Sequence, residues 1–176
     1  MEEIRIVPLQ ENDLRQFVLD NQEAFRYGAM EEFGVRDEHY EDGDQIISEK
    51  TILRSVEEGD AYRICLGEEK VGGVIVSTEG DHGHLDILFV SPSFHSKGIG
   101  YQAWCEIEKM YPQVRVWETV TPYFDKRNIH FYINRCGFHA VEFYNSHHRD
   151  PDDPDAGSDD LMSDGMFRFI KIIDKV

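Results

Sequence analysis

The sequence predicts a mixed α+β fold built around one β-sheet. Strand-like segments outnumber helical ones, short turns join many of them, and the apolar spacing changes from helical to strand-like near residue 60. The chain has 176 residues, 40% of them hydrophobic, which suits a single domain over residues 1–176 with a sizeable core.

The first sixty residues predict one strand and two helices. Residues 4–7 have the composition of a short strand, and apolar side chains at helical spacing indicate a helix over about residues 11–25. An acidic, turn-rich segment follows at 31–45. A second, short helix then covers about residues 46–56 and ends at Gly59.

From residue 60 onward the pattern is mainly that of strands. Residues 62–66 and 71–76 flank a polar turn, which indicates a hairpin. The run 85–90 is too apolar for an edge strand and predicts a central one, ended by Pro92. The remaining predicted elements are a helix at about 99–110, a strand at 114–117, a helix at about 125–135, and strands near 138–144 and 166–173.

The net charge of the chain disfavours some classes of binding partner. It carries 35 acidic and 18 basic side chains, a formal net charge of −17. Nucleic-acid binders depend on Lys and Arg that neutralise phosphates, so this charge argues against nucleic acid and also disfavours anionic membrane surfaces. No apolar stretch approaches the roughly 20 residues of a membrane span, and no basic leader precedes an apolar run. We therefore expect a cytoplasmic protein.

The cysteines give no sign of a metal or disulfide site. Cys65, Cys105 and Cys136 are odd in number and far apart in the sequence. They match no zinc-ligand spacing and no disulfide framework. We expect three buried free thiols and no bound metal.

Residues 88–101 are the most informative for function. Gly98 and Gly100 open a predicted helix directly after the central strand and its loop, where glycines let backbone N–H groups approach an anion and the helix N-terminus adds positive potential. Lys97 adds a positive charge in the same loop. An anion can thus be held locally against the negative net charge, although a tight turn alone would also use two glycines.

Two segments together resemble the GNAT acetyltransferase superfamily. Residues 95–100 read His-Ser-Lys-Gly-Ile-Gly, similar to the family's acetyl-CoA loop (Gln/Arg)-x-x-Gly-x-(Gly/Ala), with His95 where Gln or Arg is usual. Residues 128–138 resemble the family's Tyr-bearing helix followed by Gly-Phe. The order of elements agrees over roughly residues 3–144 and the final strand. The resemblance implies the GNAT fold, a single mixed, mostly antiparallel sheet of about six or seven strands flanked by about four helices.

The resemblance also implies a reaction and the residues that carry it. The chain is expected to be an acetyl-CoA-dependent N-acetyltransferase that moves an acetyl group to a primary amine by direct attack on the thioester, with acetyl-CoA as co-substrate. Carried over from the family, Tyr132 is the general acid for the leaving thiolate. Gly137 follows it by five positions rather than the usual four, which either rotates the tyrosine or is absorbed as a bulge or longer helix end. For the base we predict His84, with Asp86 on the same strand face and Glu118 as a third candidate.

The residues expected to bind the cofactor gather around the glycine loop. Backbone N–H groups at the end of the central strand would polarise the thioester carbonyl. The predicted set is Phe89, Val90, His95, Ser96, Lys97, Gly98, Ile99, Gly100, Tyr101 and Asn128.

The acidic segments at 31–45 and 147–160 suggest the kind of acceptor. By analogy with the family both fall near the acceptor side of the cleft, the second within a loop at about 145–164 between the last two strands. A cationic small-molecule or peptide amine is therefore expected, such as a polyamine, an aminoglycoside or a basic peptide N-terminus. A homodimer is compatible with the family, although no residue pattern argues for it.

Two other functions remain open from the sequence. One is a non-catalytic acyl-CoA-binding regulatory domain of the same fold, which would bind the thioester without turnover. The other is an acidic protein-interaction domain that binds a basic partner and no CoA.

Overall fold

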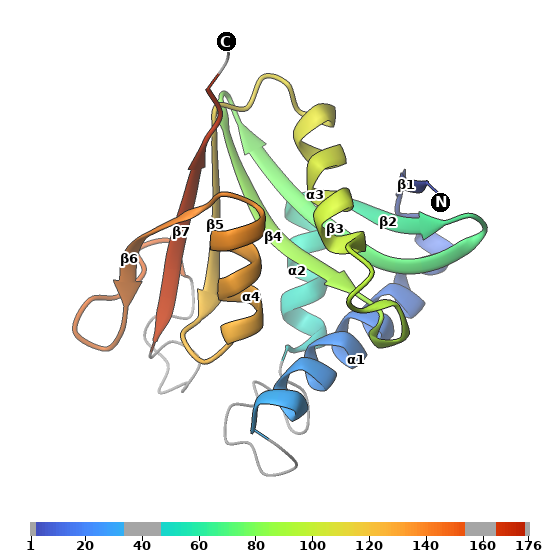
Figure 1. Cartoon of the computed structure of the whole chain (residues 1–176), viewed down its shortest axis with the longest axis horizontal. Helices are drawn as coiled ribbons and strands as arrows, with labels where there is room; N and C mark the ends of the chain where they lie inside the picture. The colour runs from blue at the N-terminus through green and yellow to red at the C-terminus, as the bar shows by residue number, and fades with distance from the viewer. Residues whose placement is uncertain (1–2, 34–46, 154–164, 175–176) are drawn as a thin grey trace.

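The computed structural model describes residues 3–33, 47–153 and 165–174, and in them seven strands form one sheet. The strand order is β1-β2-β3-β4-β5-β7-β6, in which only the β4–β5 pair is parallel. Four α-helices of the described part flank the sheet (Figure 1), so the mixed, mostly antiparallel architecture expected from the sequence is confirmed.

The elements follow one another in the predicted order. They are β1 (Ile4–Pro8), the 3₁₀ turn η1 (Glu11–Asp13), α1 (Leu14–Phe33), α2 (Glu49–Glu58), β2 (Asp60–Leu66), β3 (Glu69–Glu79), β4 (His82–Val90), the 3₁₀ turn η2 (Pro92–Phe94), α3 (Ile99–Met110), β5 (Val116–Pro122), α4 (Lys126–His130), the π-helical turn η3 (Phe131–Arg135), β6 (His139–Tyr144) and β7 (Met166–Ile172).

The largest differences from the prediction concern two helices and one strand. The first helix continues to Phe33, and residues 34–46, most of the acidic segment, lie outside the described residues. The strand predicted at 114–117 is Val116–Pro122. The helix predicted at 125–135 is a short α-helix that continues as a π-helical turn.

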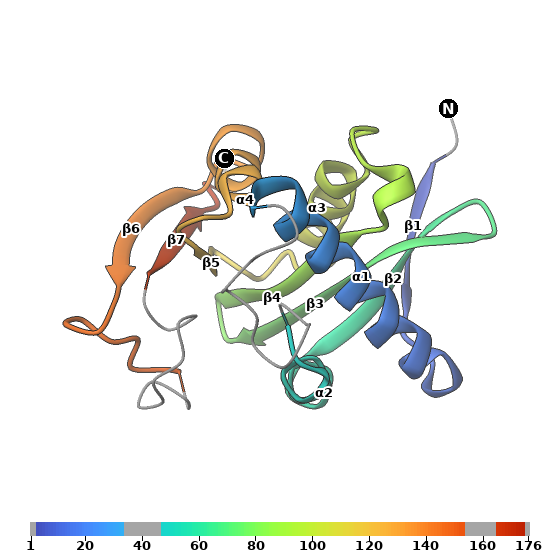
Figure 2. The same cartoon turned by 90° about the horizontal axis from the view of Figure 1, so that it is seen from below.

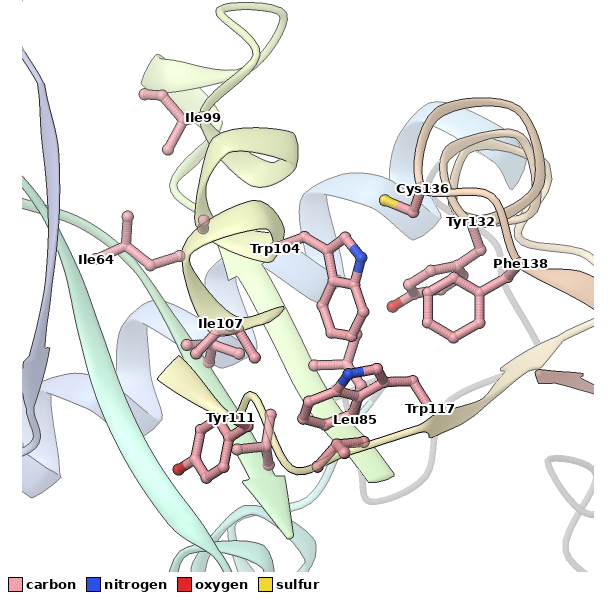
Figure 3. Close-up of a cluster of buried hydrophobic side chains, with 14 of the residues drawn as sticks. Ile64, Leu85, Ile99, Trp104, Ile107, Tyr111, Trp117, Tyr132, Cys136 and Phe138 are labelled. Carbon is pink, nitrogen blue, oxygen red and sulfur yellow. The ribbon is translucent and has the colours of Figure 1, made fainter. Parts of the chain in front are cut away.

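The helices cover both faces of the sheet, and each face has its own core. Side chains of α3 pack with β2–β5, β7 and Tyr132 in a cluster whose centre is Trp104, Trp117 and Phe138 (Figure 3). On the opposite face, α1 and α2 pack on the sheet around Phe17 and Ile52. Figure 2 shows the sheet between α2 on one side and α3 and α4 on the other.

A buried ion pair fixes the start of α1 against the sheet. Arg63 of β2 is 1% exposed. Its Nε donates to Asp13 Oδ2 over 2.7 Å and its Nη1 to Asp20 Oδ2 over 2.9 Å. Burial would raise the pKa of Asp13, but hydrogen bonds from Arg63 and Lys70 outweigh it and lower that pKa. The pair thus holds α1 in place on the sheet.

The central strand β4 carries a β-bulge at Asp86. Ile75 of β3 pairs with Ile87, but the next residue, Val76, pairs with Leu85. An extra residue reverses the alternation of a strand. Leu85 accordingly packs with the α3 cluster, whereas Ile87 packs with α1 and α2.

Strands β4 and β5 pair only at one end. Their register covers His82, Gly83 and His84 against Val116, Trp117 and Glu118. Beyond these residues the two strands separate, as Figure 1 shows from top to bottom. The separation leaves backbone groups of two central strands available to a ligand.

Two further findings concern the cysteines and the helices. Cys65, Cys105 and Cys136 are free thiols, but Cys105 is only partly buried, so the expectation of full burial is wrong for it. None of the helices in the described part of the chain is long and apolar enough to cross a membrane.

Candidate active site

A cavity of about 970 Å³ lies where β4 and β5 separate. Its walls come from both strands, the loop before α3, the N-terminal part of α3, the segment α4–η3, and α1. All three predicted catalytic residues, His84, Asp86 and Tyr132, line it. The predicted cofactor residues also line it, with Lys97 as the exception.

The loop before α3 forms a cradle of backbone N–H groups. Gly98 is the N-cap of α3 with φ 75°, and no side chain caps the helix. The first intrahelical bond runs from Gln102 N to Gly98 O over 3.1 Å, so the N–H groups of the first turn point out of the helix end. Ser96 is also left-handed, with φ 63°. Alternating left- and right-handed residues turn successive N–H groups toward one concavity that suits an anion.

Positive charge reaches the cavity from residues that the sequence analysis missed. The predicted cation, Lys97, lies over the ring of Phe94 at 4.8 Å and outside the cavity lining. Arg127 and Arg135 line the cavity instead, and Arg135 lies over the ring of Tyr101 in the first turn of α3 at 5.4 Å. Both arginines belong to the Tyr-bearing segment, so their proximity to the glycine loop could be found only through the fold.

His95 connects the end of β4 with α4. Its Nε2 donates to the carbonyl of Val90 over 2.7 Å, and its Nδ1 lies 2.9 Å from Nη1 of Arg127, which can only donate. The pKa of His95 is lowered by burial and by Arg127, against the opposing effects of the Val90 carbonyl and Glu31. His95 is therefore a neutral imidazole with its proton on Nε2.

The edge of β4 that faces the gap offers a backbone donor. Ser91 donates its N–H to the Val71 carbonyl on β3 over 2.8 Å. Because N–H groups of successive strand residues point to opposite edges, the N–H of Val90 points into the gap and that of Phe89 toward β3. On the other side of the gap, Thr119 Oγ1 donates to the Leu85 carbonyl over 2.8 Å, where the two strands begin to separate.

The longer spacing after Tyr132 is absorbed by the π-helical turn. The backbone N–H of Cys136 donates to the carbonyl of Phe131 over 3.0 Å, a bond that spans five residues. Such a turn accommodates one extra residue within a helix. Of the two outcomes expected from the sequence, a bulge or longer helix end describes the structure.

Tyr132 lies in the wall of the cavity and in the core at once. It is 6% exposed and packs against Phe138 and Phe169, with ring centroids 5.6 and 5.9 Å away. Burial raises its pKa well above the usual value, as do Asp125 and Cys136, so the hydroxyl is protonated at neutral pH. Figure 3 shows its ring beside that of Phe138.

Asn128 helps to begin α4. Its backbone N–H and its Nδ2 donate to the two carboxylate oxygens of Asp125, over 3.0 and 2.8 Å, so Asp125 is the N-cap of the helix. Asn128 lines the cavity, but its amide nitrogen is used in this cap. Its clearest role in the structure is to position the segment that carries Tyr132.

His84 is the best placed base of the three candidates. Its Nδ1 lies 2.9 Å from Asp86 Oδ1 and its Nε2 4.0 Å from Glu118 Oε1. Burial lowers the pKa of His84, but Asp86, Glu118 and Asp150 together raise it above 6.5. Glu118 itself is held by both Nε and Nη2 of Arg168, over 2.8 and 2.7 Å, which lowers its pKa, and it lies outside the cavity lining.

Carboxylates of the predicted acidic loop reach the same cavity. Asp150, Asp152 and Asp153 line it together with Arg149. Only residues 147–153 of the segment 147–160 belong to the described structure. The effect of Asp150 on the pKa of His84 shows that this wall lies close to the candidate base.

The chain belongs to the acetyltransferase (GNAT) family, whose model matches residues 18–138. Among curated proteins, the uncharacterized protein YrkN of Bacillus subtilis (strain 168) is 45% identical over 173 residues, covering 94% of this chain and 91% of YrkN.

Solved structures agree on the fold. A Bacillus subtilis acetyltransferase in complex with CoA has a TM-score of 0.63 at 18% identity, over 98% of this chain and 99% of that one. A GNAT family acetyltransferase from Elizabethkingia anophelis with acetyl-CoA bound has a TM-score of 0.66 at 13% identity, over 98% and 100%.

Proposed function

We propose that the cavity transfers the acetyl group of acetyl-CoA to a primary amine. One observation carries the proposal: the separation of β4 and β5 brings the N–H cradle of α3, the Val90 N–H and the His84–Asp86 pair into one cavity. The CoA and acetyl-CoA bound to the two similar structures support this choice of co-substrate.

The residues divide the work by their chemistry. Acetyl-CoA supplies the thioester, whose carbonyl carbon forms the new bond to the amine nitrogen as the bond to sulfur breaks. The cradle at Gly98 and the nearby Arg135 hold phosphate groups, and the Val90 N–H polarises the thioester carbonyl. Neutral His84 accepts the proton of the ammonium acceptor, and the protonated Tyr132 hydroxyl donates one to the leaving sulfur.

The acceptor proposed is an amine with a further positive charge. Asp150, Asp152 and Asp86 face the cavity, and carboxylates favour a cation in their vicinity. The three free thiols are typical of a reducing compartment, and the proposal places the reaction in the cytoplasm.

The acceptor class is tested by kinetics with spermidine and with a neutral primary amine. Asp152→Asn should raise the KM for spermidine more than that for the neutral amine, and added salt should reduce the difference. Asp174→Asn, an exposed carboxylate outside the cavity lining, is the matched control. If Asp152→Asn and the unaltered chain have the same KM for spermidine, and also the same KM for the neutral amine, a cationic acceptor is excluded.

Binding and turnover separate the acetyltransferase from its two alternatives. Acetyl-CoA at about one hundred times its dissociation constant should stabilise the fold by roughly 2.7 kcal/mol, seen as a higher melting temperature. Release of free CoA thiol with an amine then indicates transfer. Stabilisation without thiol release over a panel of amines would indicate an acyl-CoA-binding regulatory domain, and no stabilisation would indicate a protein-interaction domain.

A further inference from the structure

A chain of side-chain contacts crosses one end of the cavity through His95. The Val90 carbonyl accepts from His95 Nε2 (2.7 Å), His95 Nδ1 accepts from Arg127 Nη1 (2.9 Å), and Arg127 Nη1 lies 3.3 Å from Glu31 Oε2. The rings of Tyr27 and His95 pack in a T-shaped arrangement, with their centroids 5.4 Å apart. We call Val90, His95, Arg127 and Glu31 the His95 chain.

The His95 chain joins elements that are distant in the sequence. Val90 ends β4, His95 lies in the loop before α3, Arg127 is in α4 and Glu31 is near the end of α1. Figure 2 shows the last part of α1 beside α4. Since α1 and α4 both line the cavity, the His95 chain connects the glycine loop with two of the cavity walls.

The chemistry of the His95 chain restricts which residue can stand at position 95. That residue must donate to a carbonyl, which can only accept, and accept from a guanidinium, which can only donate. Neutral histidine offers one N–H donor and one acceptor nitrogen, glutamine offers an NH2 donor group and an acceptor oxygen, and arginine offers donors alone. Of the two residues usual at this position in the family's loop, Arg127 therefore permits glutamine and excludes arginine.

We propose that His95 is a positioning residue for acetyl-CoA, which acts by holding the Val90 carbonyl and Arg127 in fixed places. The Val90 carbonyl and N–H share the edge of β4 that faces the gap, so a bond to one orients the other. Arg127 is held beside the N–H cradle in the same way. The inference rests on the proposed function, because it assigns this position a part in cofactor binding.

The same contacts make cofactor binding sensitive to protonation of His95. The groups that face the imidazole are the Val90 carbonyl of β4, Arg127 of α4, and Glu31 and Tyr27 of α1. When His95 takes up a second proton, on Nδ1, the Nδ1–H group faces the N–H donor of Arg127 Nη1, and the hydrogen bond between them is lost. The pKa of His95 is lowered from its usual value, so this loss sets in at a lower pH than it would for an unperturbed histidine.

The experiment compares dissociation constants for acetyl-CoA, measured by calorimetry at neutral pH, across a set of variants. His95→Gln should stay within about threefold of the unaltered chain, whereas His95→Arg should bind about tenfold or more weakly, which corresponds to about 1.4 kcal/mol. In an Arg127→Gln background the carbonyl of glutamine can accept from arginine, so His95→Arg should then cost about threefold or less. His139→Arg adds the same charge on the exposed strand β6 and serves as the control.

A second readout separates positioning from a general effect on folding. As the pH falls through the acid range, binding by the unaltered chain should weaken more steeply than binding by His95→Gln, which has no proton to gain at this position. Nitrogen chemical shifts of His95 should show the proton on Nε2 at neutral pH.

The outcomes distinguish this inference from the proposed function. If the unaltered chain binds acetyl-CoA and His95→Arg binds it equally well, or loses the same affinity with and without Arg127, the inference fails and the proposed function stands. Parallel pH profiles of the unaltered chain and His95→Gln would also overturn it. If the unaltered chain does not bind acetyl-CoA, the proposed function fails and the inference with it.

Discussion

The N–H cradle at Gly98 can be tested by two substitutions that separate backbone strain from charge. Gly98 has φ 75°, and a Cβ there would meet only Gln102 Nε2, at 3.9 Å. Gly98→Ala therefore changes the backbone energy without a clash and should lower the free energy of unfolding by about 1–2 kcal/mol. Gly98→Glu should lower it by no more than this, because a carboxylate at a helix N-terminus is favourable.

Binding should separate the two variants sharply. In Gly98→Glu, the new carboxylate about 4 Å from a cofactor phosphate repels it by about 4 kcal/mol at the effective dielectric constant of a protein surface, about a thousandfold in affinity. Gly98→Ala should retain binding within about tenfold, since about 1.4 kcal/mol of strain corresponds to that factor. Urea unfolding and calorimetry with acetyl-CoA measure the two effects.

Gly80 provides a matched control for this test. It also has a positive φ, 61°, with nothing within 4 Å of its Cβ position, and it lies in the turn between β3 and β4, outside the cavity lining. Gly80→Ala and Gly80→Glu should reproduce the strain and leave binding intact. Equal affinities of Gly98→Glu and Gly98→Ala for acetyl-CoA would refute the assignment of the cradle.

Three other predictions concern the base, the acid and the anchor of α1. Asp86→Asn removes a cause of the raised pKa of His84, so the acid limb of kcat/KM against pH should move to lower pH; an unmoved limb would exclude His84 as the base. Tyr132→Phe should lower kcat about a hundredfold with the dissociation constant for acetyl-CoA nearly unchanged, and an unaltered kcat would exclude the hydroxyl as the acid. Arg63→Met leaves buried Asp13 without its main partner and should lower the free energy of unfolding in urea by about 3–5 kcal/mol. Adding Asp13→Asn to this variant should recover part of that free energy.

The fold was predictable where local signals and core packing agree. The apolar run 85–90 belongs to the fourth of the seven strands that the structure describes, and Gly59 caps α2 as expected. The strand predicted at 114–117 begins only at Val116, because Val114 is a core residue that precedes the strand. Val114 is 2% exposed and packs in the α3 cluster. Thr119 and Thr121 of the observed strand are buried in the fold, but they are polar, so the sequence did not indicate a buried strand there.

The site could be predicted in part for similar reasons. The alternation of a strand placed His84 and Asp86 together, and their contact at 2.9 Å agrees with that prediction. The bulge at Asp86 follows from pairing with β3, which one strand's sequence does not encode. Arg127 and Asp150 reach the cavity from segments far along the chain, so no local pattern could assign them to it.

The most direct test of the account is release of CoA thiol from acetyl-CoA in the presence of spermidine. The account predicts saturable, amine-dependent release by the unaltered chain, with a strong loss in both His84→Gln and Tyr132→Phe. Tight binding of acetyl-CoA without release for any primary amine would contradict the account, because the cavity would then hold the thioester without transferring its acetyl group.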